Sequence, residues 1–201
     1  VVMMVAMMFP TAAPMILMFA RVQRDKRHNG RAFVPTWVFV SAYLLLWTLF
    51  GVLAYGGAVW AERLGQQVPW LMANAARIGG SLFVLAGLYQ FTPLKRSCLA
   101  KCRTPLDFVL SSWRDGYTGS FRMGLEHGVY CLGCCWLLFV IFFPLGMMNV
   151  AAMAVVTLLI FAEKSLLPGQ RIARLAALAL IAYGALVVLV PGVLPTMRVP
   201  M

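Results

Sequence analysis

Six long apolar runs, separated by short loops, constrain this chain more than any other feature. The runs cover residues 1–20, 35–60, 70–91, 119–143, 147–162 and 173–190. A bilayer requires about 20 apolar residues from a spanning helix, and each run reaches or approaches that length. Only helices and closed barrels satisfy their backbone groups in lipid, and these continuous runs lack the alternation of strands. The sequence therefore predicts an all-α, polytopic transmembrane helical bundle with about six spans.

The composition supports one membrane domain over residues 1–201. Hydrophobic residues make up 62% of the chain and charged residues only 11%, and the mean hydropathy is +0.86. Neither a P-loop, an HExxH or GxSxG motif nor a dinucleotide fingerprint is present in the sequence, so a non-enzymatic role is favoured. Because the chain begins with Val1 and shows no signal-peptide pattern, we expect its native start to lie upstream.

Basic residues are distributed unevenly over the loops between the apolar runs. Fourteen of the 17 Lys and Arg residues lie in the first, third and fifth loops. Cytoplasmic loops of membrane proteins are enriched in Lys and Arg, so these three loops are predicted to be cytoplasmic and both ends of the chain to lie outside. The net charge of +11 is thus a topology signal, and nucleic acid is not expected as a partner.

Two features around the third loop, about residues 92–118, concern packing. The segment 105–113 spaces Leu106, Val109, Leu110 and Trp113 as one or two amphipathic turns, which suits either an interfacial helix or an ordinary polar connector. Beyond the loop, Ser120, Gly124 and Gly128 form a row of small residues at four-residue spacing. Such rows allow close helix packing, so the fourth span is predicted to lie near a neighbour.

The fourth run contains the sequence HGVYCLGCC at residues 127–135, which places one imidazole and three thiols within nine residues. On a helix, His127, Cys131, Cys134 and Cys135 follow the spacing i, i+4, i+7 and i+8 of one face. Thiols and imidazole are ligands that Cu(I) and zinc prefer. Cys134 and Cys135 point about 100° apart, so the expected co-ligands are His127, Cys131 and one of these two cysteines.

Further soft ligands lie outside this cluster. Cys98 and Cys102 occur in KRSCLAKCR of the third loop, where the flanking basic residues are expected to lower the thiol pKa values. The first run contains paired methionines, whose thioethers suit Cu(I) but also serve as flexible packing. These are Met3, Met4, Met7 and Met8. Pro10 and Pro14 interrupt the same run, as occurs where a helix kinks or lines a site.

Three elements of the sequence resemble a known family. They are AMMFPTAAPM, WRDGYTGSFRMGLEHGVYCLGCCW and the MMN and EK elements that follow. Together they resemble a bacterial family of predicted metal-binding integral membrane proteins, a domain of unknown function sometimes labelled copper chaperone. Its most specific element, HGxYCLGCCW, is matched from His127 to Trp136. The resemblance covers nearly the whole chain and implies several spans in a bacterial inner membrane.

We therefore hypothesise a membrane protein that binds, relays or transports a soft metal ion, with Cu(I) favoured and zinc as the second choice. Methionines on the outer side would receive the ion, and the cytoplasmic cysteine cluster would hold it. The expected partners are the lipid bilayer and either a metallochaperone or other membrane subunits. Two alternatives are a thiol–disulfide redox protein, in which Cys134 or Cys135 exchanges electrons with Cys98 or Cys102, and an accessory or assembly subunit of a larger membrane complex.

Overall fold

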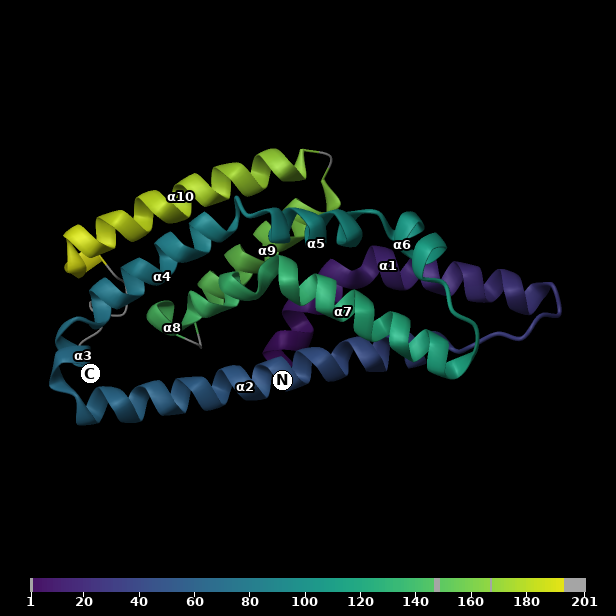
Figure 1. The fold of residues 1–201 in the computed structure, drawn as a ribbon, viewed down its shortest axis with the longest axis horizontal. Coiled ribbons are helices and arrows are strands. Elements are labelled where there is room, and N and C mark those ends of the chain that lie inside the picture. The colour runs from purple at the N-terminus through teal and green to yellow at the C-terminus, as the bar shows by residue number, and fades with distance from the viewer. Residues whose placement is uncertain (1, 147–148, 167, 194–201) are drawn as a thin grey trace. The chain divides into compact units, whose positions relative to one another are not determined.

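The computed structural model describes residues 2–146, 149–166 and 168–193, apart from the side chains of Met3 and Met4. Over these ranges the regular structure is helical and contains no strand, which confirms the all-α prediction (Figure 1). The helices, in chain order, are α1 (Val2–His28), α2 (Thr36–Gln67), α3 (Pro69–Ala73), α4 (Ala75–Tyr89), α5 (Pro93–Arg103), α6 (Pro105–Ser112), α7 (Gly116–Val140), α8 (Phe142–Leu145), α9 (Val150–Ser165), α10 (Gly169–Leu189) and the 3-10 turn η1 (Pro191–Val193).

Four helical segments in the described ranges are long and apolar enough to cross a membrane. They are Val5–His28, Thr36–Gln67, Gly116–Leu145 and Gly169–Leu189. The third and fifth expected spans coincide instead with α4 and α9, which contain 15 and 16 residues. At 1.5 Å per residue these helices extend roughly 23 Å, less than the roughly 30 Å of a bilayer core. The third expected span is also divided, because Asn74 separates α3 from α4.

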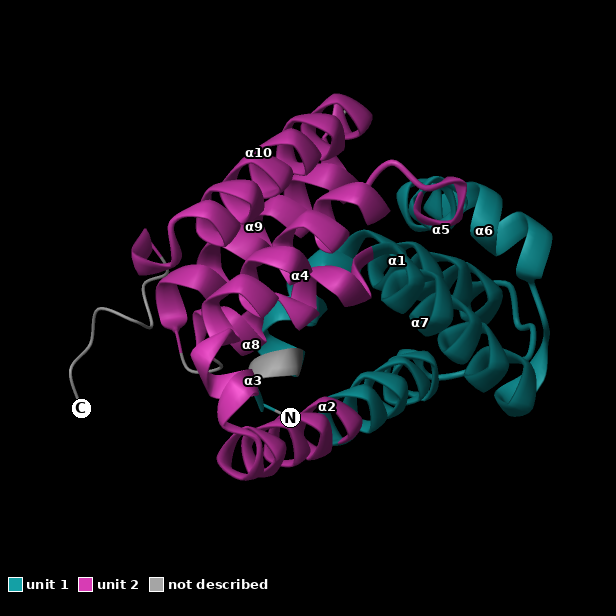
Figure 2. Cartoon of the chain, turned by 60° about the vertical axis from the view of Figure 1, so that its left-hand side comes forward, with its two compact units in different colours: residues 1–52, 96–134 teal, residues 53–95, 135–201 magenta. Residues whose placement is uncertain are grey.

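The chain forms two compact units (Figure 2). Unit 1 comprises residues 1–52 and 96–134, and unit 2 comprises residues 53–95 and 135–201. Both are assembled from segments distant in sequence, and α2, α5 and α7 each pass from one unit into the other. The two units are described separately below.

Unit 1 has an aromatic and methionine-rich core to which α1, α2, α6 and α7 contribute. Its buried members are Met15, Phe19, Phe39, Phe108, Val109 and Met123. The expected amphipathic segment at 105–113 is indeed helical as α6, and it buries Phe108 and Val109 while Leu106 and Leu110 stay exposed. The placement of α6 at a membrane surface stays a prediction.

The small residues of α7 pack against α2, as their spacing predicts. A Cβ atom on Gly124 would lie 2.3 Å from the carbonyl oxygen of Phe39, and one on Gly128 would lie 2.8 Å from Cδ2 of Leu46. Ser120, one turn earlier, is completely buried. Since only the absence of a side chain permits these approaches, the row fixes α7 against the N-terminal half of α2 within unit 1.

Unit 2 contains a comparable contact between α4 and α10 and a buried polar group. A Cβ on Gly80 would lie 2.8 Å from the carbonyl oxygen of Gly184, so the two helices approach backbone to backbone. Lys95 Nζ forms a buried ion pair with Glu163 Oε2 at 2.7 Å and also donates to Gln90 Oε1. Gln90 Nε2 donates to Glu163 Oε1 at 3.2 Å, so each of these side chains has a polar partner inside the unit.

Candidate metal site

One tyrosine hydroxyl connects the methionine element of the first span with the cysteine element of the fourth. The Tyr43 hydroxyl on α2 donates to the carbonyl oxygen of Met8 at 3.3 Å and lies 3.2 Å from Cys131 Sγ. Met8 lies on α1 and Cys131 on α7, and all three residues are completely buried in unit 1. Two residues predicted as soft ligands on separate grounds are thus positioned by the same hydroxyl.

A second hydroxyl fixes the same turn of α1. Thr11 Oγ1 donates to the Met8 carbonyl at 2.9 Å and lies 4.0 Å from Met8 Sδ. Threonines that bond back to the preceding turn commonly bend helices, as do internal prolines. α1 contains Pro10 and Pro14, and its N-terminal part is bent in Figure 1. The bent turn therefore presents Met8 to the interior of unit 1 with its carbonyl held by two hydroxyls.

The imidazole of His127 is enclosed by aromatic rings. Its ring centroid lies 6.0 Å from that of Phe39 and 5.6 Å from that of Tyr43, both in stacked arrangements. Phe108 of α6 meets the imidazole edge-on at 5.6 Å. His127 is buried, so this enclosure keeps water from one of the predicted ligands and fixes the plane of its ring.

The remaining cysteines of the cluster are also buried, but they belong to different units. Cys134 Sγ donates to the carbonyl oxygen of Cys131 at 3.0 Å, one turn earlier on α7. Cys134 belongs to unit 1, whereas Cys135 is the first residue of α7 in unit 2. Within unit 1, the predicted ligands of α7 are therefore His127, Cys131 and Cys134.

Cys98 of α5 lies directly against α7. A Cβ on Gly133 would lie 2.8 Å from Cys98 Sγ, so the glycine makes room for this thiol. Burial raises the pKa of Cys98, and the neighbouring Cys134 raises it further. The expectation that flanking basic residues would lower this pKa is wrong, because the thiol points away from solvent toward another cysteine. Cys102, one turn later, is half-buried.

Two of the four predicted methionine ligands have described side chains, and their positions can be compared with those of the cysteines. Met7 and Met8 are both buried, whereas the side chains of Met3 and Met4 lie outside the described residues. Cys131 is near the middle of α7 and meets the same hydroxyl as Met8, so these two ligands are not separated between opposite ends of the spans as expected. Among the described residues, no three His, Cys, Asp or Glu side chains are placed to hold one metal ion.

Sequence reasoning missed Tyr43, Thr11 and the aromatic residues around His127. The signal for the first two was available, because a hydroxyl inside an apolar run must find a polar partner within the bundle. Phe39 and Phe108 gave no such signal, since phenylalanine is equally common in packing and at sites.

Comparison with models of protein families gives a match over most of the chain. Residues 1–187 match the model of a protein family described as PpoB2, copper chaperone. Neither the search of curated proteins nor that of solved structures gave a match.

Proposed function

We propose that this chain, which belongs to the PpoB2 family of copper chaperones, binds copper as Cu(I) inside a membrane and passes it to a partner protein. The supporting observation is that the backbone carbonyl of Met8 and the thiol of Cys131 both meet the hydroxyl of Tyr43, which brings α1 and α7 together at these two residues. Thioether and thiolate are both soft ligands, and soft ligands select Cu(I). Met8, His127 and Cys131 would hold the ion in this proposal, as one thioether, one imidazole and one thiolate.

The chemistry of this donor set favours Cu(I) over zinc. Structural zinc takes four tetrahedral ligands from Cys, His or carboxylates, and the described residues offer no such group. One thiolate with neutral thioether and imidazole ligands would balance the single charge of Cu(I). A complex without net charge is the least costly kind to bury in an apolar interior.

The protein's own residues would prepare this site in two ways. The aromatic rings of Phe39, Tyr43 and Phe108 shield the imidazole from water. The Tyr43 hydroxyl lies within hydrogen-bonding distance of Cys131 Sγ. Its single proton goes to the Met8 carbonyl in this structure. It would turn to Cys131 when that thiol loses its proton, as metal binding requires. Hydrogen bonds to a charged acceptor are stronger than those to a neutral one, so this contact would gain strength when metal binds.

Transfer of the copper ion to a partner protein would proceed through the cysteines of α5. Cys98 faces Cys134 across Gly133, and Cys102 follows one helical turn later among basic residues. We propose that Cys102 and Cys98 exchange the ion with a soluble metallochaperone whose contact surface is acidic. In this proposal the chain crosses a bacterial inner membrane six times, and α5 faces the cytoplasm. The third span is then the broken pair α3–α4, and the fifth is the short helix α9.

The copper content of the purified protein tests this function. Reconstituted wild type should retain Cu(I) through size-exclusion chromatography in reducing buffer, and Cys131→Ser combined with Cys134→Ser should lose it. Ser120→Ala is the matched control, because Ser120 is equally buried on the same helix. Wild-type copper content in the double cysteine variant would contradict the proposal.

A second candidate function, thiol–disulfide exchange, is favoured by the proximity of Cys98 and Cys134. It would require a thiolate at one of the two positions, and the raised pKa of Cys98 opposes that. Mass spectrometry of peptides from oxidised protein distinguishes the two functions. A Cys98–Cys134 disulfide that forms and is reduced reversibly would support redox chemistry, whereas unchanged thiols would leave copper binding as the function.

A further inference from the structure

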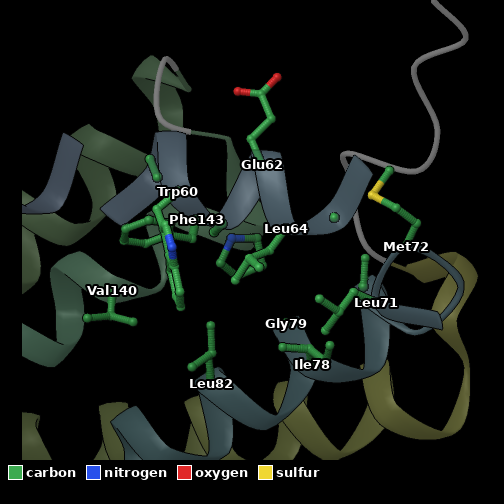
Figure 3. A pocket seen from close by; sticks show the side chains of 15 residues that line it. Trp60, Glu62, Leu64, Leu71, Met72, Ile78, Gly79, Leu82, Val140 and Phe143 are labelled. Carbon is green, nitrogen blue, oxygen red and sulfur yellow. The ribbon is translucent and has the colours of Figure 1, made fainter. Parts of the chain in front are cut away.

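Unit 2 contains an apolar cavity of about 640 Å³ that takes no part in the candidate metal site. Its walls come from the C-terminal half of α2, from α3 and α4, from the last residue of α7 and from α8. Figure 3 shows Trp60, Leu82 and Phe143 among the side chains that line it. Ligand sites in proteins commonly have volumes of about 300–1,000 Å³, so this cavity is large enough for a specific occupant.

The lining identifies the kind of occupant. Glu62 is the single charged lining residue, and Figure 3 shows its carboxylate pointing away from the apolar side chains. The other lining side chains are aliphatic, aromatic or thioether, and among them only the indole N–H of Trp60 is a polar group, which is fewer than a sugar, nucleotide or peptide site requires. α2 also exposes apolar side chains, among them Val52 and Leu53, as a helix in contact with lipid does. The most abundant apolar ligand beside such a helix is an acyl chain.

Two arginines that neighbour lining residues in the sequence indicate the headgroup. Arg63 stands between the lining residues Glu62 and Leu64 on α2, and Arg77 directly precedes the lining residue Ile78 on α4. Both arginines are exposed, and Arg77 Nη1 donates to Asn74 Oδ1 at 3.2 Å. Most of the basic residues lie in the loops predicted to be cytoplasmic, so these two are conspicuous on the predicted outer side. Guanidinium groups bind phosphate through paired hydrogen bonds.

We propose that this cavity binds a phospholipid with an anionic headgroup, with one acyl chain inside and the phosphate held by Arg63 and Arg77. The site is independent of copper, because none of its residues belongs to unit 1. A bound lipid would fill the space between α2 and α4 and stabilise the short helices of unit 2.

Native mass spectrometry of the full chain tests this proposal. The protein is delipidated in detergent and incubated with equal amounts of phosphatidylglycerol and phosphatidylcholine that carry the same acyl chains. One phospholipid per chain should remain bound, with phosphatidylglycerol preferred about tenfold. The variant Arg63→Gln with Arg77→Gln should abolish the preference. Arg171→Gln with Arg174→Gln, two exposed arginines of α10, should retain it.

Variants that fill the cavity test the position of the acyl chain. Leu82→Trp and Ala75→Leu enlarge lining side chains and should each reduce the retained lipid at least fivefold. Leu175→Trp is the control, because Leu175 is exposed on α10 and outside the cavity. Equal retention in both cavity variants and the control would overturn the proposal. Equal binding of the two lipids by wild type would overturn it as well.

Discussion

At the scale of single residues, hydroxyl groups inside apolar helices organise the candidate site. Tyr43 and Thr11 both donate to the carbonyl of Met8, and Tyr43 also meets Cys131. A buried hydroxyl without a partner would cost about 1–3 kcal/mol, so each of these groups is strongly directed toward its partners. The soft ligands are therefore positioned by residues that bind no metal themselves.

The substitution Tyr43→Phe should weaken copper binding while leaving the fold intact. It removes the hydroxyl near Cys131 and retains the ring that stacks on His127. A hydrogen bond to a charged group contributes about 1.5–3 kcal/mol, so the affinity for Cu(I) should fall roughly tenfold or more. Competition with a colorimetric Cu(I) chelator measures this change. Tyr130→Phe, which alters a half-buried tyrosine of α7, is the control and should bind Cu(I) as tightly as wild type does. Equal affinities for wild type, Tyr43→Phe and Tyr130→Phe would exclude a role for the Tyr43 hydroxyl.

Cys98 should react with alkylating reagents only at higher pH than an ordinary thiol. Its raised pKa keeps the thiol protonated, and the thiolate is the reactive form. The folded state therefore holds this proton at pH values where the unfolded chain has lost it, so stability should decline as pH rises above the ordinary thiol pKa. Iodoacetamide labelling of the Cys98 peptide across a pH series gives the midpoint. Cys134→Ala should lower that midpoint, and a midpoint equal to that of a free peptide would contradict the burial of Cys98.

The residue pattern predicted part of the arrangement of the candidate site. His127, Cys131 and Cys134 share one face of α7 because helical periodicity fixes that relation, and the spacing of the cluster predicts it. The convergence of Met8, Tyr43 and Cys131 depends on three helices meeting at one depth. No local sequence pattern shows at which level along three helices their residues meet. The prediction from sequence therefore put the methionines and the cysteines at opposite ends of the spans.

At the scale of helices, glycines determine which surfaces meet. α7 packs on α2 through Gly124 and Gly128, and α4 packs on α10 through Gly80 and Gly184. The first contact was predictable, because the four-residue spacing of small residues is a known packing pattern. The second was not, since Gly80 and Gly184 are single positions in separate helices whose pairing depends on tertiary structure.

Gly80→Ala should destabilise unit 2, whereas the matched substitution Gly56→Ala should not. The added methyl group on α4 would lie 2.8 Å from the carbonyl oxygen of Gly184, while the space around Gly56 is open. Overpacking costs about 1–3 kcal/mol, and alanine in an open helical position contributes up to about 1 kcal/mol relative to glycine. The midpoint of thermal unfolding in detergent should therefore fall for Gly80→Ala and stay or rise for Gly56→Ala. A midpoint that falls for Gly56→Ala but does not fall for Gly80→Ala would contradict the packing of α4 on α10.

The limits of helices were harder to predict than their existence. Hydrophobicity located the four described segments that are long and apolar enough to span a membrane, since burial in lipid requires continuous apolar sequence. It could not show that Asn74 divides α3 from α4, because asparagine is tolerated within helices. The buried pair Lys95–Glu163 was equally hidden, because its partners are far apart in sequence and charged residues near a loop resemble interfacial ones.

At the scale of the whole molecule, the two units separate two kinds of chemistry. Unit 1 holds Met8, His127 and Cys131 among aromatic side chains, and unit 2 holds the buried ion pair and the apolar cavity. Membership in the PpoB2 family identifies copper as the metal to test first. The central claim is that Cu(I) is bound by sulfur atoms from both α1 and α7 of unit 1.

X-ray absorption at the copper edge of the loaded protein tests that claim most directly. Wild type should show Cu(I) in a shell dominated by sulfur, and Met8→Leu should lose one sulfur ligand. Met15→Leu is the matched control, because Met15 is buried in the same helix but belongs to the hydrophobic core of unit 1. Its copper shell should equal that of wild type. Identical sulfur shells in wild type and Met8→Leu, or a shell of nitrogen and oxygen alone, would contradict the account.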